Sequence, residues 1–239
     1  MRPDRHQPPA TLRAVTFDVG WTFLSVRPSV GHVYARVARD WTGQTFDPHR
    51  LNRRFQTAWR GCADFDHSRA GWMALVDATF AGLVTEPPSR TFFGDLYRRF
   101  GQPGVWRVDP HLPEVLTRLR SHGLRLGIVS NWDLRLRPLL RALDLERQFD
   151  VVIISAEVGF SKPSPAIFLR AADVLGLAPQ EILHVGDDPR QDYQGARHAG
   201  FQAVTLHRGL RRPEPRRIGS LRQLLPWIRR AGFLGTRGL

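Results

Sequence analysis

Four short segments of the chain carry side chains suited to phosphoryl transfer, and each comes after an apolar run. They are Asp18-Val19-Gly20-Trp21-Thr22, Ser130-Asn131, Ser161-Lys162-Pro163 and Gly186-Asp187-Asp188, with Asp192 four residues beyond. A carboxylate can attack phosphorus to form an acyl phosphate, while a hydroxyl, a lysine and backbone N–H groups can bind phosphate oxygens. Because phosphoryl transfer depends mostly on positioning and charge stabilisation, these segments predict a phosphatase-like site.

Four carboxylates in these segments would repel one another if they lay together: those of Asp18, Asp187, Asp188 and Asp192. Such crowding is costly without a cation, and hard oxygen ligands of this kind hold Mg²⁺. The group therefore predicts a magnesium site. Taken singly, these residues have simpler interpretations, because an aspartate can cap a helix and Ser130-Asn131 can form a turn. For Asp133, an N-cap on the following helix is the preferred interpretation.

Lysine is almost absent from a strongly basic chain. Of the 35 lysine and arginine residues, Lys162 is the only lysine. This bias is typical of a GC-rich coding background that replaces lysine by arginine. A lysine ammonium is a compact point charge that can enter a crowded carboxylate and phosphate site, where a planar guanidinium fits differently. The surviving lysine therefore favours a functional role over chance survival.

Elements that can position these side chains follow from the apolar pattern. Short apolar runs alternate with amphipathic stretches from residue 107 to the end, which predicts a parallel sheet with helices on both faces. The expected strands are residues 13–17, 124–129, 151–154, 182–185 and 203–206. One helix is expected to begin at Ser164-Pro165, another lies near residues 191–199, and a last helix is expected to open with the capping-box spacing of Ser220 and Gln223. Ligands of open parallel sheets bind outside the carboxyl ends of the strands, where three of the four segments begin.

A long insertion separates the first expected strand from the others. Residues 27–106 lack convincing strands but contain apolar residues at helical spacing, which predicts about four helices, one of them beginning at Asp47-Pro48. Two such faces are Val30, Val33, Tyr34, Val37, Ala38 and Trp41, and Phe92, Phe93, Leu96, Tyr97 and Phe100. The aromatic residues are expected to form the core between these helices.

Length and composition restrict the class of protein. The chain has 239 residues and a net charge of +13, but its arginines are spread along the whole chain and no aromatic-basic motif accompanies them, so nucleic-acid binding is not expected. The densest cluster, Arg211-Arg212 and Arg216-Arg217, is expected to lie in a solvated loop. No run of 18 apolar residues exists, which excludes a membrane-spanning helix. The polar start indicates a loose tail rather than a secretory signal, and the single cysteine, Cys62, fits a reducing cytoplasmic setting. No feature indicates an oligomeric state.

In order and spacing, the four segments resemble the four motifs of the haloacid dehalogenase (HAD) superfamily. The segments 130–136 (SNWDLRL) and 185–196 (VGDDPRQDYQGA) are most similar to subfamily IA members related to the rhythmically expressed gene product of flies. The resemblance implies a Rossmann-like three-layer α/β core with a parallel sheet and an inserted all-helical cap. The core would comprise residues 1–26 and 107–239, of which 1–12 form the tail, and the cap residues 27–106.

The resemblance also implies roles for individual residues of a magnesium-dependent hydrolase. Asp18 would be the nucleophile and a Mg²⁺ ligand, the Gly20 carbonyl and Asp187 would be further ligands, and Asp192 would bind or assist. Ser130 and Lys162 would bind the phosphate of a small phosphorylated substrate, with Lys162 also paired to Asp18. The remaining candidates for substrate contact are Asn131, Thr22, which would support the nucleophile loop, and Trp21.

One position departs from the pattern of the superfamily's phosphatases. They usually carry a second aspartate two residues after the nucleophile, as general acid and base, where this chain has Gly20. Loss of such a group typically costs about 10²- to 10⁴-fold, most for alkyl phosphates with poor leaving groups. Three hypotheses remain: a selective or weak phosphatase, a 2-haloacid dehalogenase, which the acidic cluster disfavours, and a non-catalytic metal- or phosphate-binding module. A Schiff-base phosphonatase is excluded because residues 27–106 contain no lysine.

Two tryptophans beside the motifs have two interpretations. Trp21 and Trp132 can narrow the pocket or stack on a flat substrate. Packing against the cap is the slightly preferred interpretation for both.

Overall fold

The computed structural model describes residues 11–62 and 65–234. The expected N-terminal tail lies mostly outside these residues. The chain divides into two compact units. The first unit contains Met1–Phe23, Asp109–Ser130 and Arg147–Leu239, and the second contains Leu24–Val108 and Asn131–Glu146. Among the described residues no helix has the length and apolar character needed to cross a membrane.

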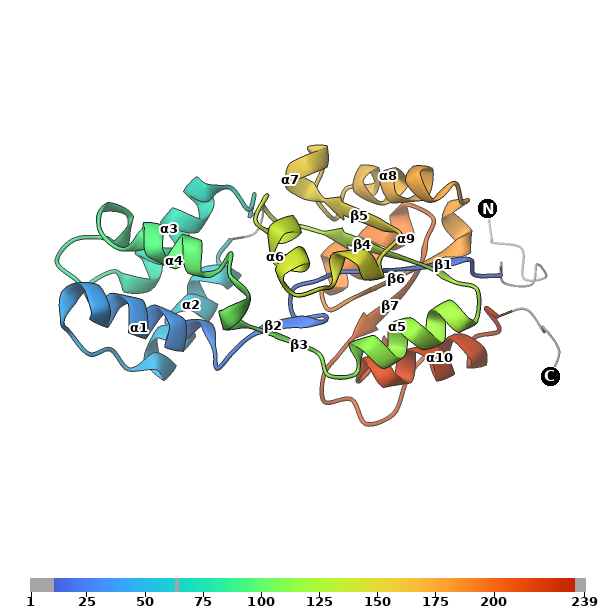
Figure 1. The fold of residues 1–239 in the computed structure, drawn as a ribbon, viewed down its shortest axis with the longest axis horizontal. Helices are drawn as coiled ribbons and strands as arrows, with labels where there is room; N and C mark the ends of the chain where they lie inside the picture. Colours follow the sequence, from blue (N-terminus) through green and yellow to red (C-terminus); the bar gives the residue numbers. More distant parts are fainter. Residues whose placement is uncertain (1–10, 63–64, 235–239) are drawn as a thin grey trace. The chain divides into compact units, whose positions relative to one another are not determined.

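The first unit is built on a six-stranded sheet in which every neighbouring pair runs parallel (Figure 1). The strand order is β5-β4-β1-β6-β7-β8. The strands are β1 (Ala14–Phe17), β4 (Arg125–Ser130), β5 (Val151–Ile154), β6 (Ile182–Gly186), β7 (Gln202–Leu206) and β8 (Arg217–Ile218). The five expected strands are present. The two-residue β8 was expected to be part of a solvated arginine-rich loop, and its shortness explains why no apolar run announces it.

The central position of β1 gives its carboxyl end two neighbours. Phe17 pairs with Ile128 of β4 on one side and with Val185 of β6 on the other. All four residues of β1 are buried, as expected for a strand covered on both faces. The residue after β1, Asp18, therefore emerges between the ends of β4 and β6, which precede two of the other predicted segments.

Helices cover both faces of this sheet, with α7 and α8 on one side and α5 and α10 on the other (Figure 1). The helix α8 begins where the sequence predicts, because the Ser164 hydroxyl accepts a hydrogen bond from the Ala166 N–H and Pro165 occupies the first turn. It ends at Gly176, whose φ is 60°. The helices of the unit are α5 (Leu112–Ser121), α7 (Ser155–Val158), α8 (Pro165–Leu175), α9 (Gly195–His198) and α10 (Leu224–Arg230).

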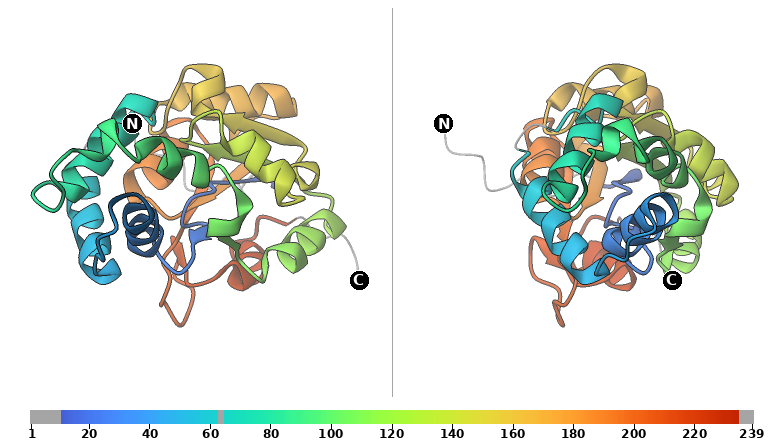
Figure 2. Two further views of the ribbon diagram at one scale, coloured as in Figure 1. Left: turned by 60° about the vertical axis from the view of Figure 1, so that its left-hand side comes forward. Right: turned by 90° about the vertical axis from the view of Figure 1, so that its left-hand side faces the viewer.

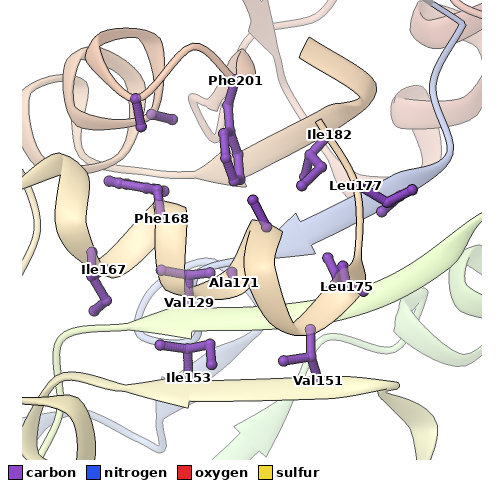
Figure 3. Close-up of a cluster of buried hydrophobic side chains, with 14 of the residues drawn as sticks. Val129, Val151, Ile153, Ile167, Phe168, Ala171, Leu175, Leu177, Ile182 and Phe201 are labelled. Carbon is purple, nitrogen blue, oxygen red and sulfur yellow. The ribbon is translucent and has the colours of Figure 1, made fainter. Parts of the chain in front are cut away.

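A buried apolar cluster joins α8 to the sheet (Figure 3). Ile167, Phe168 and Ala171 of α8 pack with Val129 of β4 and Ile153 of β5. The segment with the only lysine, Ser161-Lys162-Pro163, directly precedes Ser164, the N-cap residue of this helix. In the described part of the chain the 3₁₀ helices are Pro88–Arg90, Pro103–Val105, Glu146–Gln148, Pro179–Glu181 and Leu221–Gln223, and Pro189–Gln194 is a π-helix.

Two predicted helix starts differ in detail from the structure. The helix expected near residues 191–199 is the π-helix Pro189–Gln194 followed by α9. The capping box expected at Ser220 and Gln223 is absent, because the Ser220 side chain makes no capping bond and the Gln223 Oε1 accepts from the Gly219 N–H at 2.7 Å. Gln223 satisfies a donor one residue earlier than the box requires.

The second unit contains the four helices expected in the insertion, seen from two directions in Figure 2. They are α1 (Val30–Thr42), α2 (Pro48–Arg60), α3 (Arg69–Phe80) and α4 (Phe93–Arg99), with the ribbon β2 (Leu24–Val26) and β3 (Trp106–Val108) and the helix α6 (Leu136–Ala142). Aromatic side chains form its core, as expected, with the Tyr34 ring within 6 Å of those of Phe55, Phe80 and Phe100. Trp41 is an exception: it is 55% exposed and donates to Asp95.

Candidate active site

Asp18 is the centre of the polar cluster at the carboxyl end of the sheet. It follows β1 and is 7% exposed. Its Oδ1 accepts hydrogen bonds from the Ser130 hydroxyl at 3.0 Å and from the Lys162 ammonium at 2.6 Å. Its Oδ2 accepts from the Thr22 hydroxyl at 3.2 Å. Residues from three of the four predicted segments therefore meet at one carboxylate.

Lys162 lies between two carboxylates and is itself almost fully buried. Its Nζ donates to Asp18 Oδ1 at 2.6 Å and to Asp192 Oδ1 at 2.5 Å. Burial disfavours the ammonium, but attraction from Asp18 and Asp192 outweighs this and raises the pKa of Lys162 above its usual range. The lysine is therefore a permanent positive charge beside Asp18 at neutral pH.

Asp192 is held by three donors from different elements. Besides Lys162, it accepts from the Asp188 N–H at 2.9 Å through Oδ2 and contacts His184 Nε2 at 3.2 Å through Oδ1. Burial opposes its charge, but Lys162 and the hydrogen bond from His184 dominate and lower the pKa of Asp192. The Asp192 carboxylate packs against the backbone of Gly186. Only glycine leaves room for it, because a Cβ at position 186 would lie 2.1 Å from the Asp192 Cγ.

His184 is a site residue that the sequence analysis missed. It is 1% exposed in the middle of β6, and burial lowers its pKa, so that the ring is neutral at pH 7. Because the Asp192 carboxylate can only accept, the ring proton resides on Nε2. Its Nδ1, 3.0 Å from the Thr16 hydroxyl, then accepts from that hydroxyl. The only sequence signal was a histidine in an otherwise apolar strand.

The acidic residues divide into two groups. Asp188 caps the following turn, since its Oδ1 accepts from the Arg190 and Gln191 N–H groups, so the capping interpretation is confirmed for it. Asp187 instead lies with Asp18 and Asp192, where one oxygen of each lies within 4.8 Å of the others. Thr22 also contacts this group, because its hydroxyl, which donates to Asp18 Oδ2, lies 3.4 Å from Asp187 Oδ1.

The three grouped carboxylates fit a divalent cation. Two oxygen ligands of one Mg²⁺ ion lie at most about 4.2 Å apart, so the carboxylates need only a small inward movement to bind one. Burial, followed by repulsion from Asp18 and Asp192, raises the pKa of Asp187 to about 8, and burial also raises the pKa of Asp18. A bound cation would relieve this repulsion.

Gly20, Trp21 and Thr22 form the turn that follows Asp18. The turn is closed by a hydrogen bond from the Phe23 N–H to the Val19 carbonyl at 3.1 Å. Thr22 is fully buried, whereas Trp21 is 50% exposed and has a left-handed backbone with φ of 56°. A bulky residue seldom adopts this conformation.

Asn131 and Trp132 belong to the second unit, although they follow Ser130 directly. Asn131 is buried. The Trp132 ring lies 5.2 Å from that of Trp106, which agrees with the packing interpretation. Asp133 is not the N-cap of α6, because that position is Arg135. Its carboxylate instead accepts from the Arg135 N–H and guanidinium and from the Trp72 indole N–H.

The chain is similar to several curated proteins over most of its length. It is 34% identical to haloacid dehalogenase-like hydrolase domain-containing protein 3 of Xenopus laevis, over 82% of this chain and 85% of that protein. It is 29% identical to the rhythmically expressed gene 2 protein of Drosophila melanogaster, over 82% and 83%. It is 39% identical to a phosphoglycolate phosphatase of Shigella boydii, over 83% and 82%.

A solved structure and a family model give the same assignment. The structure of a HAD phosphatase from Thermococcus onnurineus superimposes with a TM-score of 0.65 at 29% identity, covering 90% of this chain and 97% of that one. The model of haloacid dehalogenase-like hydrolases matches residues 12–200. The fold and subfamily expected from the motifs are thus confirmed, and the chain belongs to the haloacid dehalogenase-like hydrolase family.

Proposed function

We propose that this hydrolase is a Mg²⁺-dependent phosphatase that acts on a small phosphorylated metabolite through an aspartyl-phosphate on Asp18. The observation that carries the proposal is the convergence on Asp18 of a hydroxyl, an ammonium and two further carboxylates. The similarity to named phosphatases supports it. The cytoplasm is the proposed location.

The proposed chemistry assigns a step to each group around Asp18. The Asp18 carboxylate attacks phosphorus, so that an O–P bond forms and the bond to the leaving oxygen breaks; water then cleaves the aspartyl-phosphate. Ser130 and Lys162 bind the phosphate oxygens, and Thr22 orients Asp18. Asp18, Asp187, Asp192 and the Gly20 carbonyl would hold Mg²⁺, which when bound supplies charge neutralisation for the carboxylates and the phosphate.

The substrate is proposed to meet two further parts of the chain. Trp21, being half exposed next to the nucleophile, offers an aromatic face to the leaving group, and Asn131 is a candidate for contact with the phosphate. Residues 27–106 are proposed to act as the cap and residues 1–26 and 107–239 as the core.

Gly20 leaves the proposed reaction without the usual proton donor to the leaving oxygen. We therefore expect turnover to depend steeply on the leaving group, with acyl and aryl phosphates hydrolysed about 10²-fold or more faster than alkyl phosphates. The measurement is kcat/KM on a panel of phosphate esters graded by leaving-group pKa, with and without Mg²⁺. Equal rates on alkyl and aryl esters would show that another group supplies the proton. No turnover, with Mg²⁺ or phosphate still bound, would favour a binding module.

Mg²⁺ affinity is expected to increase with pH. Because the pKa of Asp187 is raised to about 8, the metal-free site retains a proton at pH 6 that a bound cation must displace. The apparent association constant should therefore rise by about tenfold per pH unit from pH 6 to 8 and level off above pH 8. Calorimetric titration of Mg²⁺ at pH 6, 7, 8 and 9 measures this. Asp187→Asn should bind more weakly and lose most of the slope, whereas a flat wild-type profile would contradict the assignment of Asp187.

A second candidate function, 2-haloacid dehalogenation, is favoured by the glycine at position 20, where phosphatases of the superfamily carry an aspartate. Displacement of halide by a carboxylate needs no protonated leaving group, so Gly20 would be no defect. That reaction proceeds without Mg²⁺, so it gives no role to the two carboxylates of Asp187 and Asp192. Halide release from 2-haloacids in the presence of a chelator would support the dehalogenase, and a strict Mg²⁺ requirement would exclude it.

A further inference from the structure

Arg208 lies outside the predicted motifs and contacts the turn that follows Asp18 through two side-chain hydrogen bonds. It lies two residues beyond the end of β7. Its Nη2 donates to the Thr22 carbonyl at 2.8 Å, and its Nε lies 3.4 Å from the Trp21 carbonyl as a weaker donor. Its side chain is 51% exposed, so charge alone would contribute little here. The arrangement of its donors is therefore what matters.

Asp109 fixes the orientation of the Arg208 guanidinium. Both Nη1 and Nη2 of Arg208 lie 3.1 Å from Asp109 Oδ2, and the Asp109 side chain is only 6% exposed. The other carboxylate oxygen accepts from the His111 N–H at 3.0 Å, and the Asp109 N–H donates to the Phe23 carbonyl at 2.8 Å. Arg208 and Asp109 together thus hold the carbonyls of Trp21, Thr22 and Phe23.

These carbonyls belong to a strained turn. The left-handed backbone conformation is sterically unfavourable for a residue with a Cβ, and Trp21 adopts it with φ of 56°. Such conformations persist only where the surrounding structure enforces them. The contacts of Arg208 with the Trp21 and Thr22 carbonyls provide that constraint.

We propose that Arg208, oriented by Asp109, is a positioning residue for the nucleophile, acting through Thr22; this rests on the proposed function of Asp18. Arg208 holds the Thr22 carbonyl, and the Thr22 hydroxyl donates to Asp18 and contacts Asp187. If the turn relaxes, this hydroxyl leaves the two carboxylates. Small displacements of a reacting group are enough to slow catalysis.

The first test is a double-mutant cycle between Arg208 and Trp21. Arg208→Met should lower kcat about tenfold or more with little change in KM, because the position of Asp18 and not substrate affinity is altered. In a Trp21→Gly background, where the left-handed turn is no longer strained, the same change should cost less than about threefold. An equal loss in both backgrounds, or a loss entirely in KM, would overturn the proposal.

The matched control is Arg120→Met. Arg120 also joins a carboxylate and a carbonyl of the first unit, with NH groups 3.7 Å from Asp150 Oδ1 and 2.8 Å from the Gln148 carbonyl, and neither belongs to the site. Its substitution should leave kcat unchanged. A tenfold fall in kcat for this control would show that loss of any arginine that joins a carboxylate to a backbone carbonyl slows the enzyme. That result would overturn the specific role of Arg208.

The second test does not depend on activity. In hydrogen exchange followed by mass spectrometry, Arg208→Met should increase exchange in the peptide covering residues 18–24, whereas Arg120→Met should not. Unchanged exchange would overturn the proposal even if the enzyme is active. If wild type has no turnover on any substrate, the proposed function fails while this measurement still decides the role of Arg208. Arg208→Lys keeps the charge but replaces the guanidinium by a single ammonium, so the increase in exchange should be smaller than in Arg208→Met. If Arg208→Met does not fold, the lysine variant takes its place in this test.

Discussion

Asp18→Asn is expected to abolish turnover while leaving the protein folded. An amide is a poor nucleophile for phosphorus, so the reaction loses its covalent route, and we expect kcat to fall by at least about 10⁴-fold. The change should cost less stability than the loss of Lys162, because Lys162 keeps Asp192 as a charged partner. Burial already raises the pKa of Asp18, which means that the fold disfavours its charge, and asparagine keeps an oxygen that can accept from Ser130 or Lys162. The measurements are single-turnover rates and the midpoint of thermal unfolding.

The control for this variant is Asp188→Asn. Asp188 is acidic and adjacent to Asp187, but its Oδ1 caps the Arg190 and Gln191 N–H groups, a role that asparagine can also fill. Its kcat should stay within about threefold of wild type. Activity of Asp18→Asn at wild-type level would sink the proposed mechanism, and phosphorylation of the protein in Asp18→Asn would show that another residue is the nucleophile.

Lys162→Met is expected to lose both activity and stability. Breaking a buried ion pair by removing one partner costs about 3–5 kcal/mol, because the other charge stays buried without compensation. The raised pKa of Lys162 means that the fold favours its charged form. This stabilisation is present at neutral pH, below the ordinary lysine pKa of 10.5, and is lost as the pH rises through the higher pKa of the folded state. The full loss is therefore expected at pH 7, together with a fall in kcat of about 10²-fold or more.

A compensating variant separates the structural role of Lys162 from its catalytic role. Loss of the lysine leaves the carboxylates of Asp18 and Asp192 buried without a cationic partner. The double variant Lys162→Met/Asp192→Asn removes one of these two charges. The amide introduced at position 192 can accept from the Asp188 N–H, and His184 can take its other tautomer, accept from the amide and donate to Thr16. The double variant should therefore recover about half of the lost unfolding free energy without recovering activity. Wild-type stability in Lys162→Met alone would contradict the ion-pair geometry.

Several features of the fold could be predicted from local sequence, because they depend on short-range patterns. Strands covered on both faces are continuous apolar runs, so β1, β5 and β6 were evident within one residue at each end. Ser164-Pro165 announced α8 through capping chemistry that involves only its first turn. By contrast, β8 has two residues, of which one is an exposed arginine, and no local pattern distinguishes such an edge strand from a loop.

The four chemical segments could be assigned to one place because parallel strands present their carboxyl ends on the same side of a sheet. Because Lys162 is the only lysine in the chain, the sequence by itself indicated a functional role for it. The sequence alone thus determined the family, the sheet and the members of the acidic and basic cluster.

The tertiary structure decided how these members share their contacts. The structure shows that Asp188 caps the following turn, whereas Asp192 accepts a hydrogen bond from Lys162. These different roles depend on where each side chain lies, which the spacing of residues along the sequence does not specify. The structure brought His184 and Arg208 into the network from positions with no motif of their own. Contacts such as that of Arg208 with Thr22, 186 residues apart in the chain, arise from packing of the whole sheet, and only the folded chain reveals them.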